Sequence, residues 1–243
     1  MNIEVILAPA ELPALVIRDL SVTVCVVFDV LRATSTMVTA LQNGASAIIP
    51  VSDISEALEI KRQRPEVLTG GERNGVKIRA EGVEFDFGNS PREYTQVRGK
   101  TIVSTTTNGT RALRACAGAQ AVLAAAFLNL SATANFLREK KFENVMLVCA
   151  GTRENAGLED VLAAGALCEA LLDDKTKLSD SAQLALAAFR EVKEDLADAV
   201  SKSENARHLL GIPELREDVA FCLRRDVYPL VAGMKDGAIQ IIA

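Results

Sequence analysis

The sequence has no tryptophan, and aromatic residues make up only 4% of its 243 positions. Hydrophobic residues as a group nevertheless reach 49%, so the core must be built mainly from Ala, Val, Leu and Ile. Such a composition is that of a globular protein rather than a disordered or fibrous one. The length suits one large domain or two small ones, with a substantial core in either case.

The chain also lacks an excess of positive charge. The chain carries 27 Lys and Arg against 32 Asp and Glu, which gives a formal net charge of −5. The lack of a basic excess argues against nucleic acid as a partner. The overall field of such a protein will not attract an anionic ligand, so local arginines, helix N-termini or a metal ion would have to hold one.

The chain has very little histidine and no paired cysteine motif. His208 is the only histidine and lies in the helical C-terminal region, which argues against Ser/His/Asp and Cys/His catalytic schemes. The five cysteines are widely spaced and include no CxxC pair, so we expect buried, reduced thiols in a cytoplasmic protein. No apolar run approaches the length of a membrane span, and we expect no membrane partner. The first residues, MNIEVILAP, lack a basic segment and predict a first strand rather than a signal peptide.

What the sequence does contain is an alternation of short apolar runs and helical patterns. The apolar, β-branched runs suit strands that are buried on both faces, as in a parallel sheet. The alternation predicts a three-layer α/β/α sandwich with a largely parallel or mixed sheet and a helical C-terminal region. We expect residues 1–243 to form one domain, or two tightly packed subdomains. The expected strands occupy 3–7, 22–28, 46–51, 101–105, 121–127 and 145–150, and the expected helices occupy 34–43, 54–63, 109–117, 130–141 and 159–173.

Two regions interrupt this alternation. Residues 70–95 are rich in Gly, Asn and charge, and they predict a long irregular excursion of the kind that often carries function. Residues 176–208 predict one long helix or a helical pair, capped by Ser179 or Asp180. We expect this segment to pack across the sheet or against a partner subunit.

The first candidate for chemistry is VVFDVLRATSTM, in which an apolar strand ends at Asp29. Ligands of open α/β sheets bind beyond the carboxyl ends of the strands, so Asp29 could ligate Mg²⁺, act as a base or attack phosphorus. Arg32 could hold an oxyanion. The structural alternative is that Asp29 merely begins a loop and Thr34 caps the next helix.

The second candidate is VSTTTNGTRAL, in which a strand runs through hydroxyls and a turn into a helix. Unpaired N–H groups at a helix N-terminus attract anions, hydroxyls add donors, and an arginine adds a cation. The pattern predicts a phosphate-binding loop, although it is not a Walker motif. A Thr-rich strand end with an ordinary cap is the alternative. The candidate substrate-binding residues are Thr105, Thr106, Thr107, Asn108, Gly109, Thr110 and Arg111.

Further charged residues lie in or near the irregular segment. Asp86 stands between two phenylalanines and needs a partner such as a metal or an arginine. Glu159 and Asp160 open a predicted helix, where the helix dipole alone could explain acidic side chains. In GGERNGVKI, a turn with solvated charges is the alternative to a site. The candidate metal ligands in these segments are Glu72, Asp86, Glu159 and Asp160. The candidate cations that could bind an anionic substrate are Arg73 and Lys77.

Several of these motifs, taken in order along the chain, resemble the 2-phosphosulfolactate phosphatase family. The stretches that carry the resemblance are DVLRATSTMVTALQNGA (29–45), TGGERNGVKI (69–78), FDFGNSPREYT (85–95), GKTIVSTTTNGTRAL (99–113) and CAGTRENAGLEDVLAAG (149–165). Weaker similarity continues from SENARHLL to GMKDGAI. The pair TTTNGTRAL and GGERNG is the most specific part of the match.

The resemblance implies a Mg²⁺-dependent phosphatase that cleaves (2R)-2-phospho-3-sulfolactate to 3-sulfolactate and phosphate, a step of coenzyme M biosynthesis in methanogens. It implies a three-layer α/β/α fold and a small anionic phosphorylated substrate. The catalytic candidates are Asp29, Arg32 and Glu72. The attacking group is either water or the Asp29 carboxylate, which would form an aspartyl-phosphate.

The sequence is also compatible with other functions. A haloacid-dehalogenase-type phosphatase would need a second carboxylate two residues after Asp29, where Leu31 stands. The substrate could be another phosphorylated hydroxy acid. The protein could also be a non-catalytic module that binds a phosphorylated metabolite without a metal. We further expect a homo-oligomer, in the simplest case a dimer.

Overall fold

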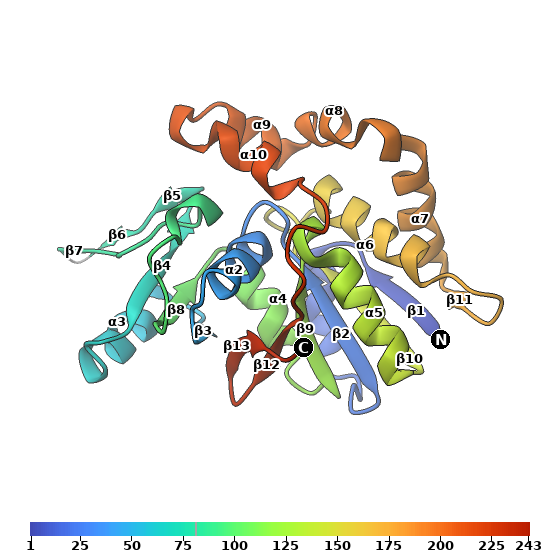
Figure 1. The fold of residues 1–243 in the computed structure, drawn as a ribbon, viewed down its shortest axis with the longest axis horizontal. Helices are drawn as coiled ribbons and strands as arrows, with labels where there is room; N and C mark the ends of the chain where they lie inside the picture. Colours follow the sequence, from blue (N-terminus) through green and yellow to red (C-terminus); the bar gives the residue numbers. More distant parts are fainter. Residues whose placement is uncertain (81) are drawn as a thin grey trace.

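The computed structural model describes residues 1–80 and 82–243, and it is built around one mixed sheet of eleven strands (Figure 1). The strand order is β11-β1-β10-β2-β9-β12-β13-β3-β8-β4-β5. The strands are β1 (Asn2–Ile6), β2 (Thr23–Phe28), β3 (Ala47–Pro50), β4 (Leu68–Arg73), β5 (Val76–Lys77), β8 (Thr101–Thr105), β9 (Ala121–Ala125), β10 (Asn144–Cys149), β11 (Lys177–Leu178), β12 (Ala232–Lys235) and β13 (Ala238–Ile241), with a separate pair β6 (Arg79–Ala80) and β7 (Val83–Glu84).

The central strands are parallel and buried on both faces, as their apolar runs predict. In β2, every residue from Val24 to Phe28 is fully buried. Val24, Val26 and Phe28 belong to one hydrophobic core, while Cys25 and Val27 belong to the other. The two-residue period of a strand thus divides one apolar run between two cores.

Helices cover both faces of the sheet. The helices α1 (Leu12–Leu15), α2 (Ala33–Gln42) and α4 (Gly109–Ala115) pack into one core. The helices α5 (Leu130–Lys140), α6 (Leu158–Leu171) and α7 (Asp180–Val192) pack into the other. A smaller cluster lies beneath α3 (Ile54–Gln63). The predicted α/β sandwich with a mixed sheet is confirmed, and all five cysteines are free and buried as expected.

The prediction of an irregular excursion over residues 70–95 is wrong at its start. The chain there forms β4, which pairs in parallel with β8 inside the main sheet. A Cβ on Gly70 would lie 2.2 Å from the Tyr94 hydroxyl, and one on Gly71 would lie 2.1 Å from the Thr105 carbonyl oxygen. The glycines that suggested a loop therefore allow a strand to pack closely against its neighbours.

The C-terminal region is helical, but it is more broken than the sequence predicts. Ser179 caps α7 by accepting a hydrogen bond from the Ala182 amide at 3.2 Å. The chain continues through α8 (Leu196–Ser201), α9 (Glu204–Leu210) and α10 (Arg216–Cys222), and returns to the sheet as the β12–β13 hairpin. Figure 1 shows α8 to α10, in orange and red, passing across one edge of the sheet. None of the helices in residues 1–80 and 82–243 is both long and apolar enough to cross a membrane.

Candidate functional site

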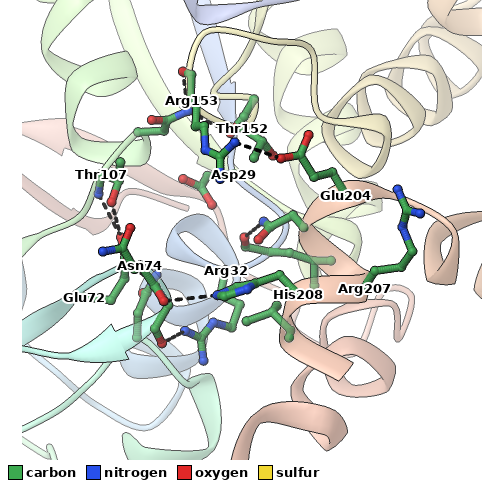
Figure 2. A pocket seen from close by; sticks show the side chains of 17 residues that line it. Asp29, Arg32, Glu72, Asn74, Thr107, Thr152, Arg153, Glu204, Arg207 and His208 are labelled. Carbon is green, nitrogen blue, oxygen red and sulfur yellow. Dashed lines mark hydrogen bonds and ion pairs between the residues drawn. The ribbon is translucent and has the colours of Figure 1, made fainter. Parts of the chain in front are cut away.

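A cavity of about 520 Å³ lies between the carboxyl ends of the strands and α9 (Figure 2). Its walls come from the loops after β2, β4, β8 and β10, together with the side of α9 that faces them. This volume is in the range of pockets that hold small molecules. The edge is also the one at which α/β sheets usually bind their ligands, because loops from several strands meet there.

Asp29 stands at the base of this cavity, immediately after β2. Its Oδ1 accepts a hydrogen bond from the Ala33 amide at 2.9 Å, at the start of α2. The Thr34 hydroxyl donates to the Asp29 carbonyl oxygen at 2.9 Å. Among the described residues, no hydrogen bond to Asp29 Oδ2 is present. Thr34 is not the helix cap of the structural alternative, because α2 begins at Ala33 and Thr34 lies within it. Asp29 instead fixes the start of α2 with Oδ1 and keeps Oδ2 for a ligand.

The electrostatic surroundings of Asp29 are unfavourable to its negative charge. Burial is the main cause, and Glu72 and Glu159 add repulsion, which together raise the pKa of Asp29 to about 7. The Ala33 amide and the Arg32 guanidinium act in the opposite direction and do not offset this effect. The site therefore carries more buried negative charge than its own cations balance.

Glu72, at the end of β4, ties two of the loops together. Its Oε1 accepts hydrogen bonds from the Thr107 amide and the Thr107 hydroxyl, both at 2.9 Å. Its Oε2 accepts from the Gly75 amide at 2.7 Å. Glu72 and Thr107 both line the cavity, beside Asp29. The structure thus brings together three residues that the sequence places in three separate motifs.

Most hydroxyls of the threonine run build the turn and do not reach the cavity. Thr105 Oγ1 accepts a hydrogen bond from Arg73 at 3.0 Å. Thr106 Oγ1 accepts from the Thr110 amide at 3.2 Å, and the Thr110 hydroxyl donates to the Thr106 carbonyl oxygen at 3.1 Å. The run therefore resembles the structural alternative more than a phosphate loop made of every hydroxyl.

Asn108 lines the cavity together with Thr107 and fixes its wall. Its amide nitrogen donates to the carbonyl oxygens of Ala150, Gly151 and Arg153 at 2.9, 2.9 and 3.1 Å. These bonds join the loop after β8 to the loop after β10, so the two loops keep one relative position.

Arg32 lines the cavity, and its guanidinium is bound by groups outside the cavity and in its wall. Its NH1 forms an ion pair with Asp218 of α10 at 2.7 Å, and its NH2 donates to the Gly75 carbonyl oxygen at 2.6 Å. Asp218 is fully buried and also accepts from the Ser90 hydroxyl at 2.7 Å. Sequence reasoning missed Asp218, because nothing in its local pattern separates it from the acidic surface residues around it.

Three predicted cations lie away from the cavity. Arg111 forms an ion pair with Glu154 at 2.5 Å, and Lys77 forms one with Glu84 at 2.8 Å. Arg73 donates to the Glu72 carbonyl oxygen and to Thr105, the last residue of β8. None of the three lines the cavity of the described structure, so it does not place them with Asp29.

Two predicted metal ligands, Asp86 and Asp160, lie outside the cavity. Asp86 accepts hydrogen bonds from the amide and hydroxyl of Thr69 at 2.8 and 2.9 Å, which supplies the partner that its apolar neighbours demand. Asp160 accepts from the Val30 and Gly151 amides at 2.7 and 2.8 Å. Neither lines the cavity. Burial, with repulsion from neighbouring carboxylates, raises the pKa of Asp160 well above its usual range.

Glu159 lies directly behind the cavity wall. Its Oε1 accepts a hydrogen bond from Asn205 of α9 at 3.2 Å, and Asn205 also donates to the Leu31 carbonyl oxygen. Glu159 Oε2 is buried without a hydrogen-bond partner in the described part of the chain. Burial raises the pKa of Glu159, and the group contributes to the charge that disfavours ionised Asp29.

The outer part of the cavity contains residues that the sequence did not single out. Arg153 comes from the loop after β10, while Glu204, Arg207 and His208 come from α9. The His208 ring nitrogen Nε2 lies 3.1 Å from the Asn74 carbonyl oxygen. His208 therefore belongs to the cavity wall, a position that its sequence pattern does not indicate.

The sequence that forms this cavity matches those of known proteins. A profile of the family described as 2-phosphosulpholactate phosphatase matches residues 8–237, which include every residue of the cavity. The chain belongs to the 2-phosphosulpholactate phosphatase family. The resemblance drawn from the sequence motifs is confirmed, and so is the prediction of a phosphatase enzyme.

Relatives of the 2-phosphosulpholactate phosphatase family are similar over nearly their whole length. Proteins named "Probable 2-phosphosulfolactate phosphatase" from Thermotoga petrophila and Caldanaerobacter subterraneus are 44% and 41% identical. The alignments cover 87% and 92% of this chain and 89% and 92% of those proteins. One of the same name from Clostridium tetani is 36% identical over 99% of this chain and 100% of its own length.

The carboxylates of this family member suit a metal that needs few protein ligands. In residues 1–80 and 82–243, no group of three or more His, Cys, Asp or Glu side chains is arranged to hold a metal ion. Mg²⁺ is usually bound by one or two carboxylates, with waters and phosphate oxygens completing its shell. Asp29 and Glu72, both in the cavity wall, are the pair that could provide them. The excess of negative charge around Asp29 fits a cation at this position.

Proposed function

We propose that this protein is a Mg²⁺-dependent phosphatase that converts (2R)-2-phospho-3-sulfolactate to 3-sulfolactate and phosphate. The observation that carries the proposal is the meeting of Asp29, Glu72 and Thr107 in one cavity at the carboxyl edge of the sheet. Membership of a family described by this activity supports the reaction class. The names of the relatives support the choice of substrate.

Asp29 is the residue that we assign to the reacting phosphorus. The Ala33 amide fixes its Oδ1, so the orientation of the carboxylate is set before the substrate arrives. Ionised Asp29 would either attack phosphorus or accept the proton of an attacking water, and both routes begin at this group. Arg32 would bind a phosphoryl oxygen. The Thr107 hydroxyl would donate to another by giving up its hydrogen bond to Glu72. Arg73, Lys77 and Arg111 remain sequence predictions without a place in this mechanism.

Asp29 and Glu72 are the residues that we expect to hold Mg²⁺. When bound, the ion would withdraw charge from the phosphoryl oxygens and help to align the attacking group. Glu72 would contribute through lone pairs that its hydrogen bonds to Thr107 and Gly75 leave free. Glu159 and Asp160 would lie behind the site without touching the substrate.

The rival functions predict different responses. A haloacid-dehalogenase-type reaction would need a second carboxylate near Asp29 from its own loop, where Leu31 is an apolar side chain in the cavity wall. A binding module would hold phosphorylated metabolites without turning them over. Another phosphorylated hydroxy acid would be hydrolysed at the same site, with a different order of substrate preference.

A phosphate-release assay tests the proposal. The purified protein is supplied with 2-phospho-3-sulfolactate, 2-phospholactate or 2-phosphoglycolate, each with Mg²⁺ and with excess EDTA. We expect phosphate release with Mg²⁺, the highest kcat/KM for 2-phospho-3-sulfolactate, and loss of turnover with EDTA. Binding without phosphate release would favour the binding module, and turnover that survives EDTA would exclude the metal.

Gly109 gives a second test, because it keeps Asp29 in place through the absence of a side chain. A Cβ at Gly109 would lie 2.6 Å from Asp29 Oδ2 and 2.6 Å from the Ala33 Cβ. We expect Gly109→Ala to shift the carboxylate and to lower kcat/KM roughly 100-fold, as misplacement of a reacting group by about 1 Å can do. Gly118→Ala is the control, since nothing lies within 4 Å of its added Cβ. Equal kinetics in the two variants would remove Asp29 Oδ2 from the reaction.

Three further proposals concern the location, assembly and pathway of the protein. We propose a cytoplasmic location, which the free, buried cysteines suit. We also propose a homo-oligomer. The link to coenzyme M biosynthesis follows from the substrate alone and depends on the assay above.

A further inference from the structure

The charges that line the cavity fall into an inner and an outer group. The inner group, around Asp29, Glu72 and Thr107, comes from the strand ends. The outer group consists of Arg153, Glu204 and Arg207. Figure 2 shows Arg207 on the side of the cavity opposite Glu72 and Thr107. A ligand that fills the cavity would therefore meet Arg207 on the wall opposite Glu72 and Thr107, with Arg153 and Glu204 also in reach.

The two outer arginines are available to an anion. In the described part of the chain, Arg207 makes no ion pair, and only its Nε is bonded, to the Ser203 carbonyl oxygen at 3.4 Å. Arg153 pairs with Glu204 at 3.4 Å, with 80% and 55% of the two side chains exposed. Exposed pairs of this kind are weak and exchange easily for a better partner.

The backbone beneath Arg153 is fixed, so its side chain starts from a defined place. Its carbonyl oxygen accepts the hydrogen bond from Asn108 at 3.1 Å. The turn around it is closed by two hydrogen bonds between Thr152 and Asn155, at 2.9 and 3.0 Å. An arginine on a fixed turn can recognise an oxyanion with less loss of freedom than one on a mobile loop.

We propose that Arg153 and Arg207 form a subsite for the sulfonate of the substrate. The sulfonate replaces Glu204 as the ion-pair partner of Arg153. The inference rests on the proposed function and extends it to specificity. In a 2-phospho-3-sulfolactate, the sulfur is bonded to C3, one bond farther from the phosphate-bearing carbon than the carboxylate carbon. The sulfonate therefore reaches farthest from the phosphate, and its three oxygens suit two forked guanidinium groups.

The test compares selectivity between substrates rather than overall rate. kcat and KM are measured with Mg²⁺ for 2-phospho-3-sulfolactate and for 2-phospholactate, which lacks the sulfonate. We expect Arg207→Met and Arg153→Met each to lower the ratio of the two kcat/KM values roughly tenfold, mainly through KM for the sulfonated substrate. Glu204→Gln should raise the ratio about threefold, because it removes an internal competitor. Arg190→Met is the control, as this arginine pairs with Glu169 on a distant helix.

A binding measurement separates failure of this inference from failure of the proposed function. Calorimetric titration with 3-sulfolactate and with lactate requires no turnover. We expect 3-sulfolactate to bind the wild-type protein more tightly than lactate does, and Arg207→Met to weaken 3-sulfolactate binding roughly tenfold. A protein that binds 3-sulfolactate in this way but releases no phosphate keeps the subsite and loses the phosphatase. Selectivity ratios and 3-sulfolactate affinities that are unchanged in Arg153→Met and Arg207→Met overturn the subsite.

Discussion

Asp29→Asn is expected to lower kcat/KM for phosphate release at least about 1,000-fold, because it removes the carboxylate that we propose to react and to bind the metal. The variant keeps the hydrogen bond from the Ala33 amide, since an asparagine oxygen accepts it as well. The fold should therefore persist, and the loss should appear in kcat. Steady-state kinetics with Mg²⁺ measure the effect. Asp198→Asn, at an exposed carboxylate that pairs with Lys202, is the control.

The same substitution should stabilise the metal-free protein at neutral and alkaline pH. The pKa of Asp29 is about 7 in the folded state against 3.8 as its ordinary value, so between these limits the folded chain binds the extra proton. The free energy of unfolding of the wild-type protein should then fall as pH rises through this window, and stay level above it. Asp29→Asn removes this contribution. Urea unfolding in EDTA should show the variant more stable by about 2–4 kcal/mol near pH 8, with the difference vanishing near pH 4.

Two outcomes would contradict this account of Asp29. Turnover close to the wild-type rate in Asp29→Asn would remove the residue from the chemistry. If the difference in unfolding free energy between wild type and Asp29→Asn did not change with pH, the fold would not raise the pKa of Asp29. The site would then have no excess of negative charge that calls for a cation.

Asp218→Asn is expected to destabilise the protein by about 3–5 kcal/mol, because it leaves the Arg32 charge buried without its counter-charge. Both side chains of the pair are almost completely buried, at 2% and 0% exposure. Urea unfolding measures the change. Glu217→Gln is the matched control from the same helix, where the side chain is 74% exposed and pairs with Arg92. There we expect a change of less than about 1 kcal/mol.

The Arg32–Asp218 pair also joins α10 to the loop that carries Asp29. Loss of the Asp218 charge should also loosen Arg32 within the cavity, so kcat/KM should fall in the fraction that remains folded. A double variant, Arg32→Met with Asp218→Leu, should recover part of the stability and none of the activity. Similar stabilities for Asp218→Asn and Glu217→Gln would show that the buried pair has no such role.

The layers of the fold could be predicted from the sequence because they follow from local patterns. The run from Val24 to Phe28 is apolar throughout, and only a strand buried on both faces accommodates it. Helix α3 follows its predicted bounds from 54 to 63, and its cap at Asp53 accepts a hydrogen bond from the Glu56 amide. Asp29 could be placed at the carboxyl edge for the same reason, since its strand was clear.

The parts of the fold and site that could not be predicted depend on contacts between segments that are distant in the sequence. β4 looks like a loop until its glycines are seen against Tyr94 and Thr105. Arg111 and Arg153 both follow strand ends, but Arg111 pairs outside the cavity with Glu154 while Arg153 reaches the cavity wall. Which of two arginines faces a cavity depends on side-chain direction within a turn, and a motif does not record that.

The contribution of α9 was the hardest to foresee. Arg207 and His208 enter the cavity only because the chain passes across the edge of the sheet after α7 and α8. Their sequence pattern is that of an ordinary amphipathic helix. Asp218 is a similar case, since its burial becomes evident only when Arg32 is placed beside it.

We propose above all that Asp29 and Glu72 hold a divalent cation beside a phosphate in the cavity under α9. A crystal grown with Mn²⁺, phosphate and 3-sulfolactate tests it most directly, because Mn²⁺ gives an anomalous signal and also prefers oxygen ligands. The account predicts an anomalous peak within bonding distance of an Asp29 carboxylate oxygen, with phosphate bound between it and Thr107. A fully occupied Mn²⁺ site at Asp86 or on the outer surface, with phosphate absent from the cavity, would contradict it.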